Sequence, residues 1–389
     1  MEGTSVTDPW TSGSQPLPVS LLTGFLGSGK TTVLNHLLCH PDMAKTVVII
    51  NEFGAIGLDH DLVARASEDL VLLNSGCLCC TVRGDLIDTL RTLFLKRVRG
   101  EVVAFERVVI ETTGLADPAP ILHTLMTDPL LAARFRLDGV ITTVDAATGW
   151  GTLDRQVEAV KQAAVADRLL LTKADLTGDD AAAALERRLR ALNPAAPLIP
   201  VRDGAVDPGL LFDAGLYNPR TKSLDVQRWL NAEAYEAGRE QGHDHHYHDH
   251  GHDHHHHDGE HHGGEHHHHD VNRHDERIRA FCLTVEDPIP AEALDQWLEA
   301  LLLLKGPDVL RVKGILNVQG RDTPLVIHGV QHIFHPPVLL PAWPGADRRT
   351  RIVFIVRDLD EEMMRDVLTM FLDAPDERTA EGASSGGRA

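Results

Sequence analysis

Three cysteines stand close together in the sequence, at Cys77, Cys79 and Cys80. The chain has five cysteines in all, so most of its thiols fall within this short run. Thiolate sulfur is a soft ligand that suits zinc and other late transition metals, and three sulfurs leave one tetrahedral position for a further donor. The Cys-x-Cys-Cys spacing therefore predicts a metal site with an open position. Buried unreactive cysteines and a redox pair are the alternatives.

A glycine-rich segment, Gly24 to Thr31, fits the phosphate-loop pattern G-x-x-x-x-G-K-[ST] between an apolar run and a helical pattern. Glycines permit the tight turn and let backbone N–H groups face phosphate oxygens. We expect Lys30 to reach the β- and γ-phosphates and the Thr31 hydroxyl to coordinate Mg²⁺. A chance glycine-rich turn is the alternative. The predicted phosphate-binding residues are Gly24, Gly27, Ser28, Gly29, Lys30, Thr31 and Thr32.

Thr172, Lys173 and Asp175 follow another apolar run and resemble the guanine-specificity motif of GTPases. The Asp175 carboxylate can accept two hydrogen bonds from the edge of guanine, whereas adenine presents a mismatched pattern. The stem of Lys173 can lie along the base. The motif therefore predicts a guanine nucleotide as the ligand, and a solvated lysine at an ordinary strand exit is the alternative.

Glu111 ends the apolar run that begins at Arg107, and Gly114 follows three residues later. The end of a buried strand is where P-loop proteins place the acid that organises water or Mg²⁺. We expect Glu111 in that role, completing a catalytic set with Lys30 and Thr31, and we expect the Gly114 backbone to contact the γ-phosphate. A capping carboxylate is the alternative for Glu111, and Asp145 is a second candidate acid.

A histidine-rich tract is a second predicted metal-binding segment. Between His243 and His274, 17 histidines stand among Asp, Glu and Gly. Imidazoles with an unperturbed pKa of about 6.5 are largely neutral and ligating at pH 7, so we expect weak, interchangeable binding of Zn²⁺, Ni²⁺, Co²⁺ or Cu²⁺. An expression tag and an inert linker are the alternatives. Glu52 is a further candidate ligand or switch residue. The predicted histidine ligands are His243, His245, His246, His254, His255, His256, His257, His266, His267, His268 and His269.

Length and charge limit the class of protein. The chain has 389 residues, 43% of them hydrophobic, and a formal charge of −20, which argues against general nucleic-acid binding. No apolar run approaches the ~18 residues of a membrane helix. The start does not read as a secretory signal and the cysteine spacing does not read as a disulfide framework, so we expect the cytoplasm. Cys39 and Cys282 lie in apolar surroundings and are predicted core residues.

Short apolar runs alternate with amphipathic stretches from residue 19 to residue 201, which predicts an α/β fold with a doubly wound, mostly parallel sheet. Strands are predicted over Val19–Thr23, Thr46–Ile50, Leu70–Leu73, Arg107–Ile110, Gly139–Val144, Arg168–Leu171 and Leu198–Val201. Helices are predicted over Lys30–Cys39, Asp85–Val98, Pro118–Phe135, Leu153–Ala166 and Ala181–Leu192.

The remaining chain divides by composition. We expect a disordered tail over 1–17, a P-loop GTPase domain over 18–222, and a helix (Ser223–Gly238) with the histidine-rich linker over 223–276. A smaller α+β domain follows over 277–374, before a disordered tail over 375–389. Its predicted strands are Arg279–Val285, Leu310–Leu316, Thr323–His328, Gln331–His335 and Thr350–Val356, and its predicted helices are Ala291–Leu304 and Asp360–Phe371.

Taken together, the motifs resemble those of the CobW family of metal-handling P-loop GTPases, relatives of the nickel-insertion GTPases for urease and hydrogenase. The resemblance covers roughly residues 18–372. In one departure, Ala55 follows the NEFG motif where the family often has Glu, so no acidic ligand is implied there. The motifs that carry the resemblance are GFLGSGKTT (24–32), NEFG (51–54), GCLCC (76–80), ETTGLADP (111–118), TKAD (172–175), RVKGIL (311–316) and DRRTRIVFIVRD (347–358).

The resemblance implies a GTPase domain, a Cys-x-Cys-Cys metal site, a variable His-rich linker and a smaller C-terminal domain. Family members are known or proposed as metallochaperones, most often for zinc, others for cobalt in cobalamin synthesis or for nitrile hydratase. We therefore expect a GTP-hydrolysing metallochaperone that delivers zinc to a client metalloprotein under nucleotide control. A cobalt-handling protein of cobalamin synthesis and a zinc buffer or sensor with incidental GTPase activity are the alternatives. The expected ligands are GTP, Mg²⁺ and Zn²⁺ (or Co²⁺). A homodimer is a further expectation, and neither nucleic acid nor membrane is an expected partner.

Overall fold

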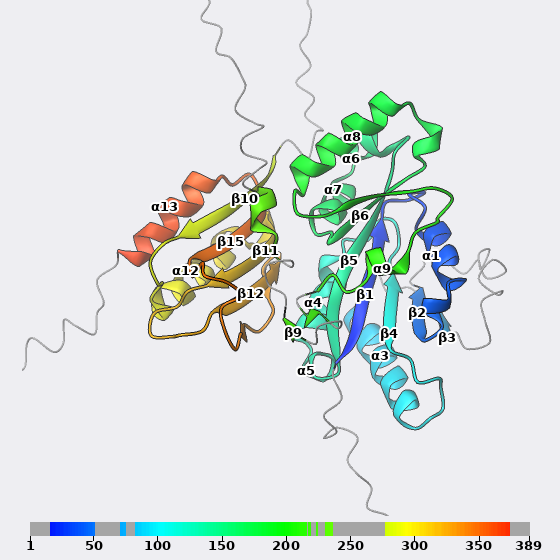
Figure 1. The fold of residues 1–389 in the computed structure, drawn as a ribbon, viewed down its shortest axis with the longest axis horizontal. Helices are drawn as coiled ribbons and strands as arrows, with labels where there is room; N and C mark the ends of the chain where they lie inside the picture. The colour runs from blue at the N-terminus through cyan, green and yellow to red at the C-terminus, as the bar shows by residue number, and fades with distance from the viewer. Residues whose placement is uncertain are drawn as a thin grey trace, which may run out of the picture.

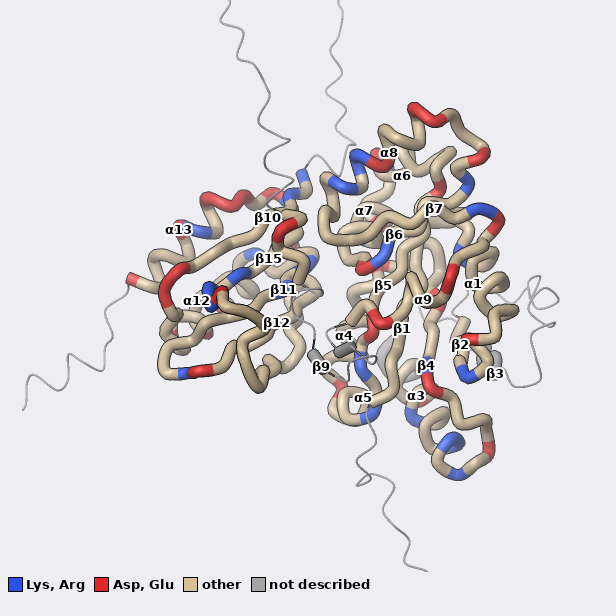
Figure 2. The backbone as a smooth tube through the Cα atoms, in the orientation of Figure 1, with Lys and Arg blue, Asp and Glu red and all other residues tan. Residues whose placement is uncertain are grey.

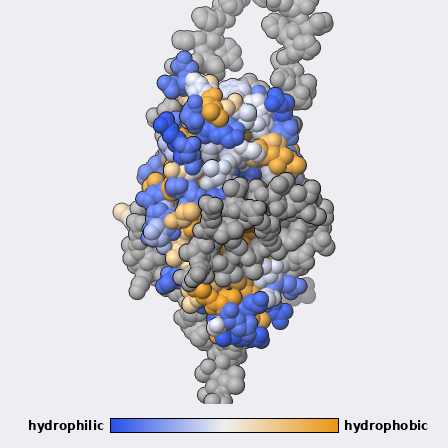
Figure 3. Space-filling view, turned by 90° about the vertical axis from the view of Figure 1, so that its right-hand side faces the viewer, coloured by the Kyte–Doolittle hydropathy of each residue, from blue (hydrophilic) through white to orange (hydrophobic). Residues whose placement is uncertain are grey.

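The computed structural model describes residues 16–50, 71–74, 82–215, 217–218, 223–224, 230–235 and 277–373. These residues form an α/β unit and a smaller α+β unit that lie side by side (Figure 1). Acidic and basic residues are interspersed over both units (Figure 2). Seen from the side of α1 and β2, small groups of hydrophobic residues are separated by hydrophilic ones (Figure 3). Within the described part of the chain, no helix has the length and apolar character needed to cross a membrane.

The first unit is built on a seven-stranded sheet in the order β3-β2-β4-β1-β5-β6-β7, and every pairing is parallel. Most residues of β1 and β4 are buried, as expected for strands that helices cover on both faces. The predicted doubly wound parallel sheet is confirmed. Its strands are β1 (Leu17–Gly24), β2 (Thr46–Ile50), β3 (Val71–Asn74), β4 (Arg107–Glu111), β5 (Phe135–Asp145), β6 (Arg168–Thr172) and β7 (Leu198–Val201).

Side-chain alternation along β1 sends neighbouring residues to opposite helical layers. Val19 and Leu21 belong to the core formed with α3 (Val82–Val98) and α4 (Ala119–Thr127), whereas Leu22 belongs to the core formed with α1 (Lys30–Leu38). The sheet is therefore packed between α1 on one face and α3 and α4 on the other. The other helices are α5 (Pro129–Ala132), α6 (Gly149–Arg155), α7 (Val157–Ala164), α8 (Asp179–Leu192) and α9 (Pro208–Leu211), with 3-10 turns η1 (Pro41–Met43) and η2 (Ala174–Leu176).

Two predicted helices are each divided in the structure. The prediction over Pro118–Phe135 is wrong in its continuity, because α4 ends before Asp128, which is extended and caps α5. The Asp128 carboxylate accepts the N–H groups of Leu130 and Leu131, and Pro129 occupies the first turn of α5. The prediction over Leu153–Ala166 likewise becomes α6 and α7, with the extended residue Gln156 between them.

The helix predicted over Ser223–Gly238 is also wrong at its start. Residues Ser223–Leu224 form β9, which pairs in antiparallel fashion with β8 (Tyr217–Asn218). Residues 232–235 are helical, after Asn231 with a φ of 46°. Helix-like composition does not prevent this strand, because pairing with β8 supplies partners for its backbone groups.

The second unit is an antiparallel sheet in the order β10-β15-β11-β12-β13, with β14 also on β12. Helices α12 (Ala291–Lys305) and α13 (Glu361–Leu372) cover the face turned away from the first unit (Figure 1). Trp297 of α12 is fully buried there against Phe354, with 6.2 Å between ring centroids. The predicted α+β arrangement is confirmed. Its strands are β10 (Ile278–Val285), β11 (Val309–Leu316), β12 (Leu325–Val330), β13 (Ile333–Phe334), β14 (Val338–Leu339) and β15 (Thr350–Arg357), with the 3-10 turn η3 (Gly306–Asp308).

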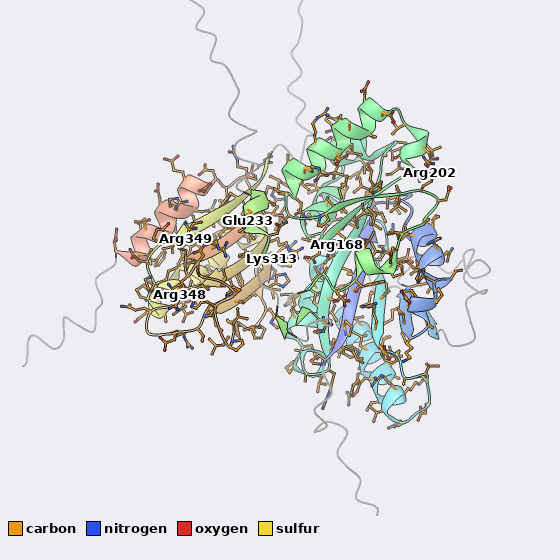
Figure 4. The ribbon with its side chains drawn as sticks, viewed as in Figure 1. Arg168, Arg202, Glu233, Lys313, Arg348 and Arg349 are labelled. Atoms are coloured by element: carbon orange, nitrogen blue, oxygen red, sulfur yellow. The ribbon has the colours of Figure 1, made fainter. Side chains whose placement is uncertain are left out.

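The opposite face of this sheet packs on the first unit. Cys282, Val353 and Ile355 share one hydrophobic core with Leu169 and Leu185 of the first unit. Alternation along β11 turns Arg311 and Lys313 toward the same interface, where Lys313 is seen facing the first unit (Figure 4). The interface is therefore an apolar surface that contains two cations.

One carboxylate pairs with both of these cations. Asp167 Oδ1 accepts hydrogen bonds from Arg311 Nη2 at 2.6 Å and from Lys313 Nζ at 2.9 Å, and Arg311 also donates to the Val165 carbonyl. Burial alone would raise the pKa of Asp167, but Arg311 and Lys313 hold that pKa well below its usual value. Burial and the neighbouring Arg311 lower the pKa of Lys313 to about 8. The two units are thus joined by a buried, charged contact as well as by apolar packing.

Candidate functional site

The candidate site lies at the carboxyl end of β1, where the chain turns sharply into α1. Gly24 ends the strand with a φ of 143°, and a Cβ there would lie 2.2 Å from Thr143 Oγ1. Only glycine fits this approach of loop to sheet. Ser28 Oγ lies 2.6 Å from the same Thr143 hydroxyl, and Ser28 N–H donates to the Phe25 carbonyl. The predicted phosphate loop is therefore a tight turn fixed to β5.

Lys30, the first residue of α1, folds back over this loop. Its Nζ donates to the carbonyls of Gly24 at 2.8 Å and Phe25 at 3.1 Å. The Lys30 side chain is buried, and its ammonium group lies within the phosphate loop. Thr31, the next residue, is half-buried, and Thr32 is exposed on the first turn of α1.

Glu111 reaches α1 from the end of β4. Thr31 Oγ1 donates to Glu111 Oε1 at 3.1 Å, and the Glu111 side chain is 5% exposed. A hydroxyl and a carboxylate so close together are hard oxygen donors of the kind that Mg²⁺ prefers. The two residues therefore fit the magnesium position expected from the sequence.

The loop that follows β4 packs against the phosphate loop. A Cβ on Gly114 would lie 2.6 Å from Leu26 N, so the two backbones approach as closely as glycine allows. Gln162 of α7 donates to the carbonyls of Gly114 at 3.2 Å and Ala116 at 3.0 Å. Gly114 is thus held beside the place where a terminal phosphate would lie.

The end of β6 carries the residues that are predicted to face the base. Lys173 has a φ of 55°, and its Nζ donates to the Gly27 carbonyl at 2.6 Å and to Asp145 Oδ2 at 2.9 Å. Thr172 Oγ1 donates to the Ser28 carbonyl at 2.8 Å. Asp175 is exposed on η2. Two of the three predicted guanine-binding residues, Thr172 and Lys173, are therefore bonded to the phosphate loop, and Asp175 follows them in the chain.

Asp145 lies on this side of the site and not beside Thr31. Burial would raise the pKa of its carboxyl, but hydrogen bonds from Lys173 and from the N–H groups of Ala147 and Thr148 lower that pKa below its usual value. A carboxylate held ionised against Lys173 orients that lysine. The position of Asp145 therefore favours Glu111 as the acid near Mg²⁺.

Strand register places Ile50 and Asn74, the last described residues before Glu52 and before the cysteine cluster, at the same end of the sheet as Glu111. Ile50, the last residue of β2, pairs with Asn74 of β3 on one side and with Glu111 of β4 on the other. Neighbouring strands lie about 5 Å apart, so Asn74 and Glu111 are separated by about 10 Å. In the sequence, Cys77 follows three residues after Asn74, and Glu52 follows two residues after Ile50.

The predicted metal ligands themselves lie outside the described residues. Across the described ranges, no group of three or more His, Cys, Asp or Glu side chains is arranged to hold a metal ion. Of the other cysteines, Cys282 is buried as predicted, but Cys39 is exposed at the end of α1, so its assignment to the core was wrong. The last turn of α1 carries Cys39 past the buried residues Leu37 and Leu38. The predicted ligands outside the described ranges are Glu52, Cys77, Cys79, Cys80 and the eleven histidines of the tract that were named above as predicted ligands.

Sequence reasoning missed the residues that hold the Gly114 loop. Gln162 is fully buried, and Lys161 beside it donates to Asp117 Oδ2 at 2.7 Å. The available signal was a glutamine at a core position of an otherwise alanine- and valine-rich helix. A buried amide needs partners, so such a residue indicates a loop or ligand nearby.

Comparison with known proteins agrees with this architecture. Residues 18–200 match the family model described as CobW/HypB/UreG, nucleotide-binding domain, and residues 278–372 match the cobalamin synthesis protein cobW C-terminal domain. The zinc chaperone YjiA of Escherichia coli (strain K12) is 32% identical over 350 residues, which cover 90% of this chain and 97% of that protein. The zinc chaperone CobW of Pseudomonas aeruginosa is 31% identical over 89% of this chain and 88% of its own length.

A solved structure shares the fold over nearly the whole chain. The crystal structure of Zn(II)-bound YjiA GTPase from E. coli has a TM-score of 0.65 at 29% identity and covers 92% of this chain and 99% of that one. The resemblance inferred from the motifs is thereby confirmed. The chain belongs to the CobW family of P-loop GTPases, and it carries the family's nucleotide-binding and C-terminal domains in that order.

Proposed function

We propose that this protein is a GTP-hydrolysing metallochaperone that binds zinc through Cys77, Cys79 and Cys80 and releases it to a client under nucleotide control. The observation that carries the proposal is the register of the sheet. Asn74 pairs with Ile50 and Ile50 pairs with Glu111, so Asn74, three residues before Cys77, lies about 10 Å from the acid of the nucleotide site. At that separation, ordering one loop can change the other.

Each part of the nucleotide site has a chemical task. A bound phosphate would replace the carbonyls of Gly24 and Phe25 as the partner of Lys30 Nζ. Thr31 and Glu111 would hold Mg²⁺, which supplies charge neutralisation on the phosphates when bound. Glu111 would also orient the attacking water, and Asp175 would select guanine.

Nucleotide control follows from the positions of the loops. Gly114 lies against the phosphate loop, where it can distinguish a γ-phosphate from its absence. GTP would order the loops after β2, β3 and β4 together, so that Glu52 and the cysteine cluster bind metal tightly. Loss of the γ-phosphate would loosen that site. A ligand can shift such an equilibrium only by its difference in affinity for the two states.

The names of relatives support zinc as the cargo. YjiA of E. coli and CobW of P. aeruginosa are both named zinc chaperones, and both match this chain over most of its length. Thiolate ligands also suit zinc, whereas cobalt and nickel accept more nitrogen and oxygen. Cobalt remains the alternative cargo, and a zinc buffer with incidental GTPase activity remains the alternative function.

The decisive measurement is the affinity for zinc with and without a non-hydrolysable GTP analogue. Coupling is reciprocal, so zinc should tighten binding of the analogue by the factor by which the analogue tightens binding of zinc, about 5- to 150-fold. Cys79→Ala should abolish this effect, whereas Cys39→Ala, an exposed thiol elsewhere, should preserve it. Equal zinc affinity in both nucleotide states would contradict nucleotide control and would favour the alternative function, a zinc buffer. A larger coupling with Co²⁺ than with Zn²⁺ would favour the cobalt alternative.

A further inference from the structure

The segment between β4 and α4, residues 112–118, is here called the sensor loop because it contains Gly114. Residues of the first unit and of the C-terminal domain both bind it. The loop approaches the phosphate loop at Gly114, where added side-chain volume would clash with Leu26. Its position therefore decides whether Gly114 can reach a γ-phosphate, and whatever holds the loop affects the nucleotide site.

Two adjacent residues of α7 hold the sensor loop from the first unit. The side-chain amide of Gln162, which is fully buried, donates to the carbonyls of Gly114 and Ala116. If the amide were turned over, its oxygen would face the oxygens of both carbonyls. The two carbonyls therefore require the orientation in which the amide nitrogen donates to them. Lys161 donates to Asp117 Oδ2 at 2.7 Å.

The C-terminal domain supplies the third contact. Gln331 Nε2 donates to Asp117 Oδ2 at 3.2 Å, across 214 residues of sequence. Gln331 lies in the turn between β12 and β13 with a φ of 53°. The neighbouring His332 ring packs on His123 of α4, with 6.1 Å between centroids.

The Asp117 carboxylate is a fixed acceptor for the hydrogen bonds from Lys161 and Gln331. Its Oδ1 accepts the N–H of Ala119 in the first turn of α4, so the carboxylate has one oxygen for the helix and one for Lys161 and Gln331. The turn that carries Gln331 is fixed in its own domain, because Gln331 N–H donates to the Leu310 carbonyl of β11. Next to Leu310, Arg311 binds the carbonyl of Val165 at the end of α7. The C-terminal domain thus contacts both the sensor loop and the helix that holds it.

We propose that Gln162 and Gln331 are positioning residues for the GTPase reaction, and that the C-terminal domain contributes through Gln331 to the preference for GTP over GDP. The inference rests on the proposed GTPase function. The three contacts keep Gly114 against the phosphate loop, the arrangement in which a γ-phosphate can be bound. Weakening them raises the cost of ordering the loop when GTP binds, while GDP binding, which does not need the loop, is unaffected.

Gln331 allows a graded test in the full-length protein. Gln331→Asn shortens the side chain beyond reach of Asp117 but suits the positive φ, so the turn is retained. The ratio of affinities for a non-hydrolysable GTP analogue and for GDP should fall about fivefold, the equivalent of one hydrogen bond. Gln331→Glu places a second carboxylate at Asp117 and should lower the ratio further. Gln319→Asn, an exposed position of the same domain, is the matched control and should leave the ratio unchanged.

Gln162→Met keeps the length of the buried side chain but removes both hydrogen bonds. It should lower the same ratio by about 10- to 100-fold, because two carbonyls lose their donor. The turnover number for GTP should fall with it, while GDP affinity stays near that of the wild type. A merely structural role would instead reduce affinity for both nucleotides together.

Hydrogen exchange gives an independent readout. By reciprocity, the GTP analogue should slow exchange in the β12–β13 turn of the wild type relative to GDP, and Gln331→Asn should remove that difference. Unchanged affinity ratios in the Gln331 and Gln162 variants of a protein that hydrolyses GTP would overturn this inference alone. A wild-type protein that neither binds nor hydrolyses GTP would overturn the proposed function as well.

Discussion

Thr31 Oγ1 and Glu111 Oε1 lie 3.1 Å apart, so the helix that follows the phosphate loop and the strand that carries the acid meet at one hydrogen bond. The two residues are 80 positions apart in the chain. Parallel pairing of β1 with β4 opposes Leu22 to Glu111, which brings the acid level with the end of β1. This contact defines the centre of the candidate site.

Removing the hydroxyl should disable hydrolysis. We expect Thr31→Ala to lower the turnover number for GTP by about 100-fold, because one of two protein oxygens available to Mg²⁺ is lost. The half-saturating Mg²⁺ concentration should rise as well. Phosphate release measured over a magnesium titration checks both. Thr127→Ala, which removes an exposed hydroxyl that donates to the His123 carbonyl, should behave as the wild type. Full activity of Thr31→Ala would exclude Thr31 as a ligand of Mg²⁺.

Base selection should depend on Asp175. In Asp175→Asn the side chain offers one acceptor and one donor in place of two acceptors, so guanine loses a charge-assisted hydrogen bond and meets a mismatched donor. GTP affinity should fall by about 100-fold, and xanthosine triphosphate should bind better than GTP. Competition binding with fluorescent nucleotides measures both effects. Asp179→Asn, in the first turn of α8, is the matched control, and an unchanged GTP preference in the Asp175 variant would place guanine recognition elsewhere.

The contact between the two domains should weaken when its buried carboxylate is neutralised. Asp167→Asn removes the carboxylate that pairs with the buried Arg311 and Lys313, and we expect a loss of about 3–5 kcal/mol in the free energy of unfolding. Adding Lys313→Met to this variant should recover part of the lost stability, because it removes one of the two buried cations. Urea unfolding of the metal-free protein measures the free energy of unfolding of each variant. Glu186→Gln, which breaks an exposed ion pair with Arg190, should cost under about 1 kcal/mol; a similarly small loss for Asp167→Asn would contradict the stabilising role.

Acid should weaken the same interface through His328. Burial, followed by the charges of Arg311 and Lys313, lowers the pKa of this histidine well below 6.5. The unfolded chain therefore binds the proton first, so the stability contributed by neutral His328 is complete above pH 6.5 and is lost as the pH falls below it. Unfolding free energies from pH 7.5 to 5, in the presence of a chelator, should show this slope. His328→Gln should flatten it and the α1 variant His36→Gln should not; equal slopes in all three would exclude His328 as the cause.

The histidine-rich tract should store metal without taking part in hydrolysis. Deleting residues 243–269 should reduce the number of zinc ions bound per chain but leave the GTP turnover number unchanged, because no residue assigned to the nucleotide site or to the positioning of its loops lies in that tract. Equilibrium dialysis and phosphate release test the two halves separately. A control deletion of residues 376–389 should change neither quantity. Loss of hydrolysis in the tract deletion would show that storage and hydrolysis are not separate.

The sequence could predict those features in which local order is sufficient. The phosphate loop is contiguous from Gly24 to Thr31, and its glycines, lysine and threonine are required by the turn itself, so both its place and its conformation followed from spacing. The buried strands of the parallel sheet followed from their apolar runs. The Pro118–Phe135 prediction failed at Asp128, because one side chain capping Leu130 and Leu131 outweighed a continuous helical pattern.

The relationships between distant residues were decided only by the tertiary structure. Nothing in the neighbourhood of Gln331 indicates Asp117, 214 residues earlier, and nothing near Arg311 indicates Asp167. Such contacts depend on strand order, register and the seating of one domain on another, which are set by the total burial of many side chains. The sequence by itself determined a phosphate loop, a guanine motif and a cysteine cluster. Only the packed chain decided that the C-terminal domain holds the loop carrying Gly114.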